Sequence, residues 1–256
     1  MGEKTTRATN TIQATEISFR IVEEIRRRNV AGVSALADEL DLSKSTVHDH
    51  LTTLVDLGYV ERAGSKYRLG LSFLTLGGNA RKHEELYEVA STVVDDLAAE
   101  TEERVKIVVE RGGKGIYLYQ ARGTKAIQTD THVGATVHLH STAAGKAMLA
   151  HLPPEKVESV IDEHGLPAHT EHTITAPASL RRELETIRSE GIAFDDQERM
   201  EGIRCIAAPL TRDGDLLGSI SLSGPKTRIC GDRFRTELPE TVSDAARVIN
   251  IMTEHR

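Results

Sequence analysis

Cysteine is nearly absent from the sequence: Cys205 and Cys230 are the only two, and they form no CxxC pair. Two such thiols are too few for a disulfide framework and match no cysteine-rich metal pattern. No apolar run approaches the ~20 residues that cross a membrane, and the polar start MGEKTTRATN lacks the apolar stretch of a secretory signal. We therefore expect a cytoplasmic protein with reduced thiols and no membrane partner.

Basic residues are outnumbered, and the formal net charge is -7. The charge is distributed unevenly along the chain. Residues 1–82 contain 12 of the 32 Lys and Arg and 10 of the 39 Asp and Glu, which gives this part a net charge of +2. The remaining residues contain 20 Lys and Arg and 29 Asp and Glu, a net charge of -9. A chain of 256 residues can bury two cores. We expect two domains, of which the first suits a nucleic-acid partner and the second repels one.

Three helical patterns follow residues 1–10, a polar stretch that we expect to be a flexible tail. Isoleucines recur every four residues between positions 17 and 25 and predict a helix that ends near Asn29. Ser34 is expected to cap a short helix over ALADEL, and Ser43 a longer one over KSTVHDHLTTLVDL that Gly58 ends. This order is the helix-turn-helix arrangement, whose second helix enters the major groove of DNA.

The third predicted helix carries the candidate DNA-reading surface. Val47, Leu51 and Leu54 stand at i, i+4 and i+7 and are expected to pack inward. Hydroxyl groups and lysine on the opposite face can bond phosphates or base edges, and the helix N-terminus attracts phosphate. The candidate DNA-binding residues here are Ser43, Lys44, Ser45, Thr46, His48, Asp49 and Thr52. Taken alone, this helix could equally present a polar, solvated face.

A predicted hairpin after Gly58 favours DNA binding over that alternative. YVERAGSKYRLG predicts a strand YVER, a turn AGS and a strand KYRL, with Arg62, Lys66 and Arg68 on or near the tip. Three short helices followed by a basic hairpin form a winged helix-turn-helix. We assign residues 11–70 to this DNA-binding domain, with double-stranded operator DNA as its partner.

The rest of the chain predicts an α+β domain. Residues 71–82 predict a linker helix, and the longer helix that follows has an apolar face formed by Leu86, Val89, Val93 and Leu97. VKIVV and GIYLYQ predict strands around a turn at residues 111–114. Further helices are expected at 142–151, 154–162 and 178–189, and further strands near 205–210 and 216–222. Residues 83–256 therefore predict a mixed antiparallel sheet with flanking helices.

Several stretches resemble the IclR family of transcriptional regulators. They are STVH, LGYV and YRLG in the first domain, then VHLHSTAAGKAMLA, TITAPASLRRELETIRSEGIAFDDQE, GIRCIAAPL and SISLSGP. The resemblance implies a winged helix-turn-helix, a linker helix and a GAF-like effector-binding and oligomerisation domain over residues 83–256. It also implies a ligand-responsive repressor or activator that acts as a homodimer or a dimer of dimers (homotetramer).

Two positions depart from the family's pattern. The family commonly has arginine where this chain has Asp49, an acid that repels phosphate but can accept a hydrogen bond from cytosine. The operator sequence is therefore not transferable, and we expect affinity to depend on dimerisation and the wing. Thr211 and Arg212 also differ from the usual residues, a turn-edge difference expected to have little effect on the pocket.

The resemblance also implies an effector pocket. Ala143 and Ala144 match positions that offer backbone N–H groups to a small carboxylate. Asp195, Cys205, Ser221 and Ser223 match polar positions that line the same cavity. The expected effector is a small organic acid, although the small residues among these could instead be tightly packed core residues.

Other motifs favour neither a nucleotide nor a metal. AAGKA resembles a phosphate loop, but His140 stands where its first glycine is required and no Ser or Thr follows Lys146. His164, His169 and His172 lie in one loop without a nearby cysteine, and loop histidines are more often solvated than metal-bound. No cofactor is expected.

The sequence shows no matched acid–base pair or nucleophile motif, so an enzyme is not expected. Two alternatives remain open for the second domain. One is an enzyme acting on a small organic acid, with Cys205 as its residue to test. The other is a dimerisation platform that senses nothing.

Overall fold

The computed structural model describes residues 11–128 and 131–255, so the tail expected at residues 1–10 lies outside the described residues. Contacts divide the chain into two compact units, one up to Ala80 and one from Arg81. We call them the head and the large domain. In the part that the structure describes, no helix is long and apolar enough to cross a membrane.

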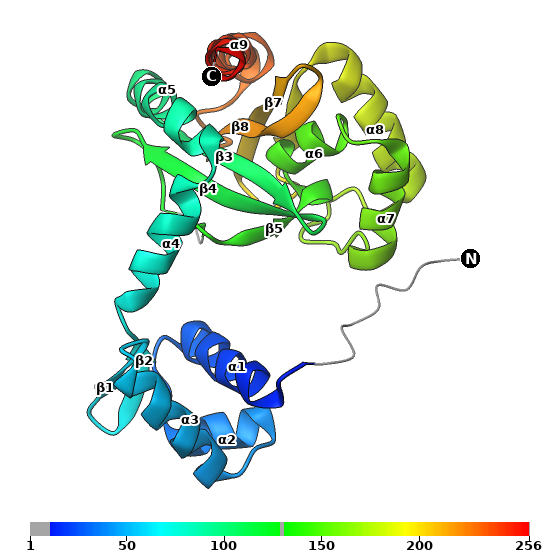
Figure 1. The fold of residues 1–256 in the computed structure, drawn as a ribbon. Coiled ribbons are helices and arrows are strands. Elements are labelled where there is room, and N and C mark those ends of the chain that lie inside the picture. The colour runs from blue at the N-terminus through cyan, green and yellow to red at the C-terminus, as the bar shows by residue number, and fades with distance from the viewer. Residues whose placement is uncertain (1–10, 129–130, 256) are drawn as a thin grey trace. The chain divides into compact units, whose positions relative to one another are not determined.

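From residue 11 on, where the structure describes it, the head consists of the helices α1, α2 and α3 and the β1–β2 hairpin, and α4 leads into the large domain (Figure 1). The elements are α1 (Gln13–Arg28), α2 (Val33–Leu40), α3 (Lys44–Asp56), β1 (Val60–Ala63), β2 (Lys66–Leu69) and α4 (Ser72–Lys82). The helical spacing buries Ile21 and Ile25 of α1 against Leu36 of α2, with Val47 and Leu51 of α3 in the same core.

Local signals place the ends of the head's helices, with one exception. The Ser43 hydroxyl accepts the N–H of Thr46 at 3.0 Å and caps α3. Gly58 has φ +77°, a left-handed conformation that lets the chain leave α3 for β1. The prediction that Ser34 caps the second helix is wrong, because the extended residue Gly32 precedes α2 and Ser34 lies in its first turn.

The large domain is built on a six-stranded antiparallel sheet in the order β5-β4-β3-β8-β7-β6. Its strands are β3 (Arg104–Arg111), β4 (Lys114–Arg122), β5 (Thr136–His138), β6 (Ala193–Asp196), β7 (Ile203–Arg212) and β8 (Asp215–Pro225). Its helices are α5 (Glu85–Thr101), η1 (Leu139–Ser141), α6 (Ala143–Leu149), α7 (Pro154–His164), α8 (Pro177–Glu190), η2 (Arg233–Glu237) and α9 (Leu238–Glu254). Helices α5 and α9 lie on one side of the sheet, and α6, α7 and α8 on the other (Figure 1).

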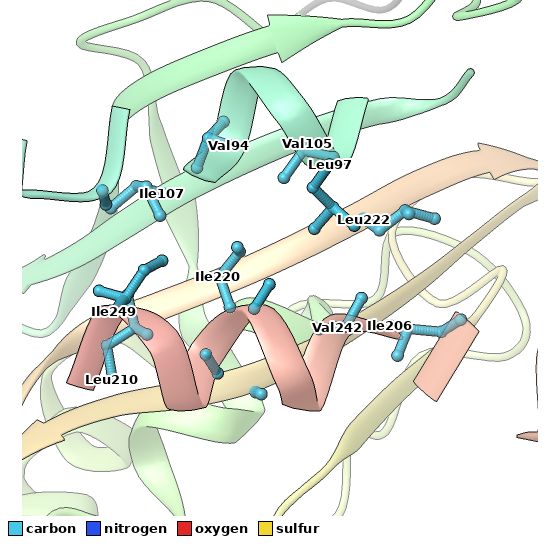
Figure 2. Packing of buried hydrophobic residues seen from close by; sticks show 14 of the residues in the cluster. Val94, Leu97, Val105, Ile107, Ile206, Leu210, Ile220, Leu222, Val242 and Ile249 are labelled. Carbon is cyan, nitrogen blue, oxygen red and sulfur yellow. The ribbon is translucent and has the colours of Figure 1, made fainter. Parts of the chain in front are cut away.

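The two faces of the sheet differ in chemistry because successive side chains of a strand point to opposite faces. On the α5 and α9 face, Val105, Ile107, Ile206, Ile220 and Leu222 form a continuous apolar core with residues of both helices (Figure 2). Their sequence neighbours point to the α6 face, which combines a second apolar core with polar residues near the start of α6.

Three expectations for the large domain differ from the structure. Val93 was predicted on the buried face of α5, but it is only partly buried and Val94 takes the core position. The turn predicted at residues 111–114 is reduced to Gly112 and Gly113, since the flanking residues belong to β3 and β4. Helix α9 is absent from the prediction, although its apolar residues recur at helical spacing from Val242 to Ile249.

Candidate DNA interface and ligand cavity

The predicted DNA-reading residues lie on one polar face at the start of α3. The Ser43 hydroxyl lies 2.8 Å from the hydroxyls of both Ser45 and Thr46, so the cap holds the three together. The side chain of Asp49 is 81% exposed, and its carboxylate lies 3.8 Å from His48 Nδ1. An acid therefore projects from the middle of this face, as its place in the sequence indicates.

Some of these groups already have partners within the head. The Thr52 hydroxyl donates to the carbonyl oxygen of His48 at 2.9 Å, so its proton is used inside the helix. In the hairpin, Arg68 donates from Nε and Nη2 to one Glu61 carboxylate oxygen at 3.0 and 2.8 Å. Because Glu61 neutralises Arg68, the basic character of the wing rests on the other two predicted residues, Arg62 and Lys66.

A small cavity of about 40 Å³ lies between the start of α6 and the sheet. All six residues predicted for the effector site line it: Ala143, Ala144, Asp195, Cys205, Ser221 and Ser223. The lining also includes residues that the sequence reasoning missed: Lys106, Tyr117, Thr131, Thr142, Arg199, Met200 and Ile203. The structure thus brings together residues that are up to 117 positions apart, from Lys106 to Ser223.

Strand pairing explains this convergence. Asp195 of β6 lies opposite Cys205 of β7, and Cys205 lies opposite Ser223 of β8. Ser221 of β8 lies opposite Lys106 of β3. The alternation in RVKIVV could have signalled that Lys106 shares a face with these residues, but only the pairing of β3 with β8 places it beside them.

Asp195 is the acid of the cavity wall. Its Oδ1 accepts the backbone N–H of Glu198 at 2.7 Å. Burial raises the pKa of Asp195 to about 6, against the opposing effect of that hydrogen bond and of Lys146. Burial also raises the pKa of the adjacent Cys205 thiol far above its usual range, with a further contribution from the Asp195 charge. Cys205 is therefore protonated at neutral pH, the unreactive form of a thiol.

A buried ion cluster lies next to the cavity. Lys146 of α6 is 1% exposed, and its Nζ lies 2.5 Å from Glu198 Oε1 and 3.0 Å from Glu183 Oε1. Burial raises the pKa of Glu198 to about 7, although Lys146 favours its ionised form. The lysine of the AAGKA motif therefore joins α6 to α8 and to the segment after β6, a role that the sequence pattern did not reveal.

The prediction that His164, His169 and His172 lie in one loop is wrong for His164, which is the last residue of α7. His164 Nε2 lies 2.8 Å from the Gly112 carbonyl oxygen. His169 instead packs against His138 and His140, with ring centroids 5.5 and 6.3 Å away. Among residues 11–128 and 131–255, no group of three or more His, Cys, Asp or Glu side chains is placed to hold a metal ion.

A winged helix-turn-helix followed by a sheet domain with a small cavity is the architecture of a DNA-binding transcriptional regulator whose second domain senses a ligand. Residues 14–64 match the IclR helix-turn-helix model, and residues 79–251 match the model for the C-terminal domain of the bacterial transcriptional regulator IclR. The chain belongs to the IclR family.

Relatives and solved structures agree with this membership. The chain is 34% identical to the probable HTH-type transcriptional regulator ArcR of Halobacterium salinarum, over 97% of this chain and 95% of the relative. The crystal structure of Thermotoga maritima IclR matches with a TM-score of 0.76 and 28% identity, over 93% of this chain and 96% of that one. An IclR homologue from Microbacterium hydrocarbonoxydans, complexed with 4-hydroxybenzoate, shares the fold with a TM-score of 0.81 at 22% identity, over 94% and 98% of the two chains.

Proposed function

We propose that the head binds operator DNA through α3 and the β1–β2 hairpin, and that a small organic acid bound in the cavity of the large domain regulates this binding. The observation that carries the proposal is the cavity itself, because residues from five strands and α6 converge on it. A ligand regulates DNA binding when its affinity differs between two conformations of the protein.

The head supplies the features that DNA recognition requires. The N-terminal turn of α3 presents Lys44 and the hydroxyls of Ser45 and Thr46, while the exposed Lys66 extends the surface from the hairpin. Such groups position a recognition helix on phosphates and base edges. The exposed Asp49 reduces the positive charge of this surface, so two heads acting together on a near-palindromic site would raise the affinity.

A second copy of the chain would fit an apolar groove on the head. The groove has a volume of about 500 Å³ and is lined by α1, the end of α3 and α4. Phe19, Leu57 and Leu76 line it and remain more than half exposed. Clustered apolar side chains on a surface mark protein interfaces. We therefore propose a homodimer through the head, with a dimer of dimers formed by further contacts.

The cavity suits an acid smaller than the ligand of the Microbacterium homologue. A water needs about 10–15 Å³ by the same measure, so about 40 Å³ holds roughly three waters. That space corresponds to an acid of about two to four carbons. Lys106, the hydroxyls of Ser221 and Ser223, and the backbone N–H groups at Ala143 and Ala144 are the donors that would hold its carboxylate.

A catalytic role for the large domain has little support, and we propose that the chain is not an enzyme. The thiol of Cys205, which the alternative requires as a nucleophile, is held protonated by burial and by the charge of Asp195. That all six effector positions line one cavity supports ligand sensing over a platform that senses nothing.

DNA binding can be tested by fluorescence anisotropy with fragments from upstream of the chain's own gene, at several salt concentrations. Lys44→Ala and Lys66→Ala should each weaken binding and reduce the salt slope by about one. Lys156→Ala, an exposed lysine on α7, is the matched control and should change neither quantity. The proposal fails if the wild-type chain shows no specific, salt-sensitive binding with or without acids of two to four carbons.

Dimerisation can be tested by light scattering. Phe19→Ser should shift the chain toward the monomer, whereas Glu16→Ser, at an exposed position on the same helix, should not. Equal masses for the two variants would contradict the interface.

A further inference from the structure

Three histidine rings lie close together beside the start of α6. His138 ends β5, His140 lies in η1, and His169 lies between α7 and α8 in residues 165–176, which we call the α7–α8 loop. The ring centroids of His138 and His140 are 5.8 Å apart, and the centroid of His169 lies 5.5 and 6.3 Å from them. We call these three residues the histidine cluster. None of them lines the cavity, so the proposed ligand site does not account for the cluster.

The cluster joins the α7–α8 loop to η1. His140 is 3% exposed, and its Nε2 lies 3.1 Å from the carbonyl oxygen of Pro167 in the loop. Because a carbonyl oxygen only accepts hydrogen bonds, Nε2 carries the proton of the neutral ring, and a second proton would go to Nδ1. Protonation of His140 therefore places a positive charge inside the protein.

The surroundings of the cluster disfavour that charge. The charged groups that act on the three rings are basic: Lys114 of β4, Lys146 of α6, His164 of α7 and Arg199 after β6. Lys146 is itself paired with Glu183 and Glu198. Among residues 11–128 and 131–255, the histidines within 4.0 Å of a carboxylate are His48, His164 and His172, which lie outside the cluster. Burial, followed by these positive neighbours, lowers the pKa of all three cluster residues below the ordinary 6.5.

The α7–α8 loop also supports one wall of the cavity. The hydroxyl of Thr170 donates to the carbonyl oxygen of Gln197 at 2.7 Å, and the hydroxyl of Thr173 donates to that of Glu198 at 2.6 Å. The segment that accepts these bonds continues to Met200, which lines the cavity. The loop is therefore held by the cluster at η1 and by two threonines at the segment after β6.

We propose that the histidine cluster is a pH-sensitive clasp, and that its protonation releases the α7–α8 loop from η1 and loosens the cavity wall at residues 197–203. A charge on buried His140 has no carboxylate to pair with, and a second charge on a neighbouring ring repels it. When the loop moves away, the rings reach water and the charged form is no longer disfavoured. The clasp itself does not depend on the proposed ligand; only its effect on ligand affinity rests on the proposed function.

Acid is the direction of release. A histidine with a lowered pKa in the clasped state binds fewer protons there than in the released state. The clasped state is therefore favoured at high pH and loses this advantage as pH falls below about 6.5. Each proton taken up on release shifts the equilibrium by at most tenfold per pH unit.

Hydrogen exchange of the full chain at pH 7.5 and 5.5 measures the release. The backbone N–H groups of His169 and Thr170 both donate to the hydroxyl of Thr173 at 3.0 Å, so their exchange reports opening of the loop. After correction for the intrinsic pH dependence of exchange, we expect both amides to exchange about three- to tenfold faster at pH 5.5 than at pH 7.5. Residues 197–203 should lose protection together with them.

Two variants and one control assign this response to the cluster. His140→Gln can still donate to the Pro167 carbonyl oxygen but cannot be protonated, and it should reduce the pH response to less than about twofold. His169→Gln, at an exposed position, avoids any disturbance of the core and should also reduce the response. His172→Gln, exposed in the same loop, is the matched control and should keep the full response. The clasp is refuted if the wild-type amides exchange equally at both pH values, or if His140→Gln and His169→Gln both respond as the wild type does.

The effect on ligand affinity is tested with lactate, whose carboxylate stays ionised at both pH values. In calorimetric titration, the wild-type chain should lose more affinity between pH 7.5 and 5.5 than His169→Gln does. Asp195 and Glu198 titrate in both chains, so the comparison removes their contribution. Equal losses in the two chains would show that the loop does not support the ligand site. If lactate does not bind the wild-type chain at pH 7.5, acid sensing fails for this acid, while the exchange result still decides the clasp.

Discussion

Replacing Lys146 by methionine is expected to destabilise the large domain strongly. The substitution removes the cation that lies 2.5 Å from Glu198 and leaves a carboxylate whose side chain is 9% exposed, with the acids Asp195 and Glu183 close enough to repel its charge. Removal of one partner from a buried ion pair costs about 3–5 kcal/mol. For a domain of this size, each kcal/mol lowers the unfolding temperature by about 2–4 °C, so we expect a loss of roughly 6–20 °C.

The pH dependence follows from the raised pKa of Glu198, about 7 in the folded chain against an ordinary value of 4.5. A carboxyl with a raised folded pKa favours the folded state at low pH and loses that contribution as pH rises through the folded pKa. At pH 5.5 Glu198 is largely protonated and needs no cation. The deficit of the Lys146→Met variant should therefore be smaller at pH 5.5 than at pH 8.

Scanning calorimetry measures both effects on the unfolding transition of the large domain. Lys156→Met, on the surface of α7, is the control and should change stability by less than about 0.5 kcal/mol. The double variant Lys146→Met with Glu198→Met removes both charges of the pair and should recover most of the loss. The reasoning is refuted if Lys146→Met is as mild as the control, or if the double variant is as unstable as the single one.

Three further substitutions or reactions test the head and the cavity. Asp49→Arg should tighten DNA binding and steepen its salt dependence by the amount expected for about one added phosphate contact. Fluorescence anisotropy measures both quantities, and an unchanged affinity would mean that this position lies away from the DNA. Gly145→Ala should destabilise the large domain, because the Cβ of the new alanine would lie 2.1 Å from the backbone oxygen of Leu139 in η1. Gly78→Ala is the control, since a Cβ at that position meets no atom within 4 Å. In the folded chain a thiol reagent should modify the exposed Cys230 but not Cys205, whose thiol is held protonated; two rapid equivalents would contradict this assignment.

The head was largely predictable because its signals are local. Helical spacing, the Ser43 cap and the left-handed Gly58 each act within one or two turns of chain, so they determine α3 and its exposed face without help from the large domain. The misplaced cap at Ser34 shows the limit of such signals, since a serine can also occupy the first turn of a helix.

The cavity was predictable only in part. Resemblance to a family supplied Asp195, Cys205 and Ser223, but neither composition nor periodicity places these residues together. Lys106 was missed because alternation along a strand shows which residues share a face, but not which strand lies beside it.

The charge states inside the large domain depended entirely on tertiary structure. Nothing in the motif AAGKA shows that its lysine would be buried, because burial depends on α8 and on the segment after β6 packing over it. The raised pKa values of Asp195 and Glu198 arise from the same packing, which removes water from both carboxyl groups. The sequence by itself therefore determined the helix-turn-helix and the polar face of α3. Strand pairing and burial, which join residues far apart in the chain, decided the shape and the charge of the cavity.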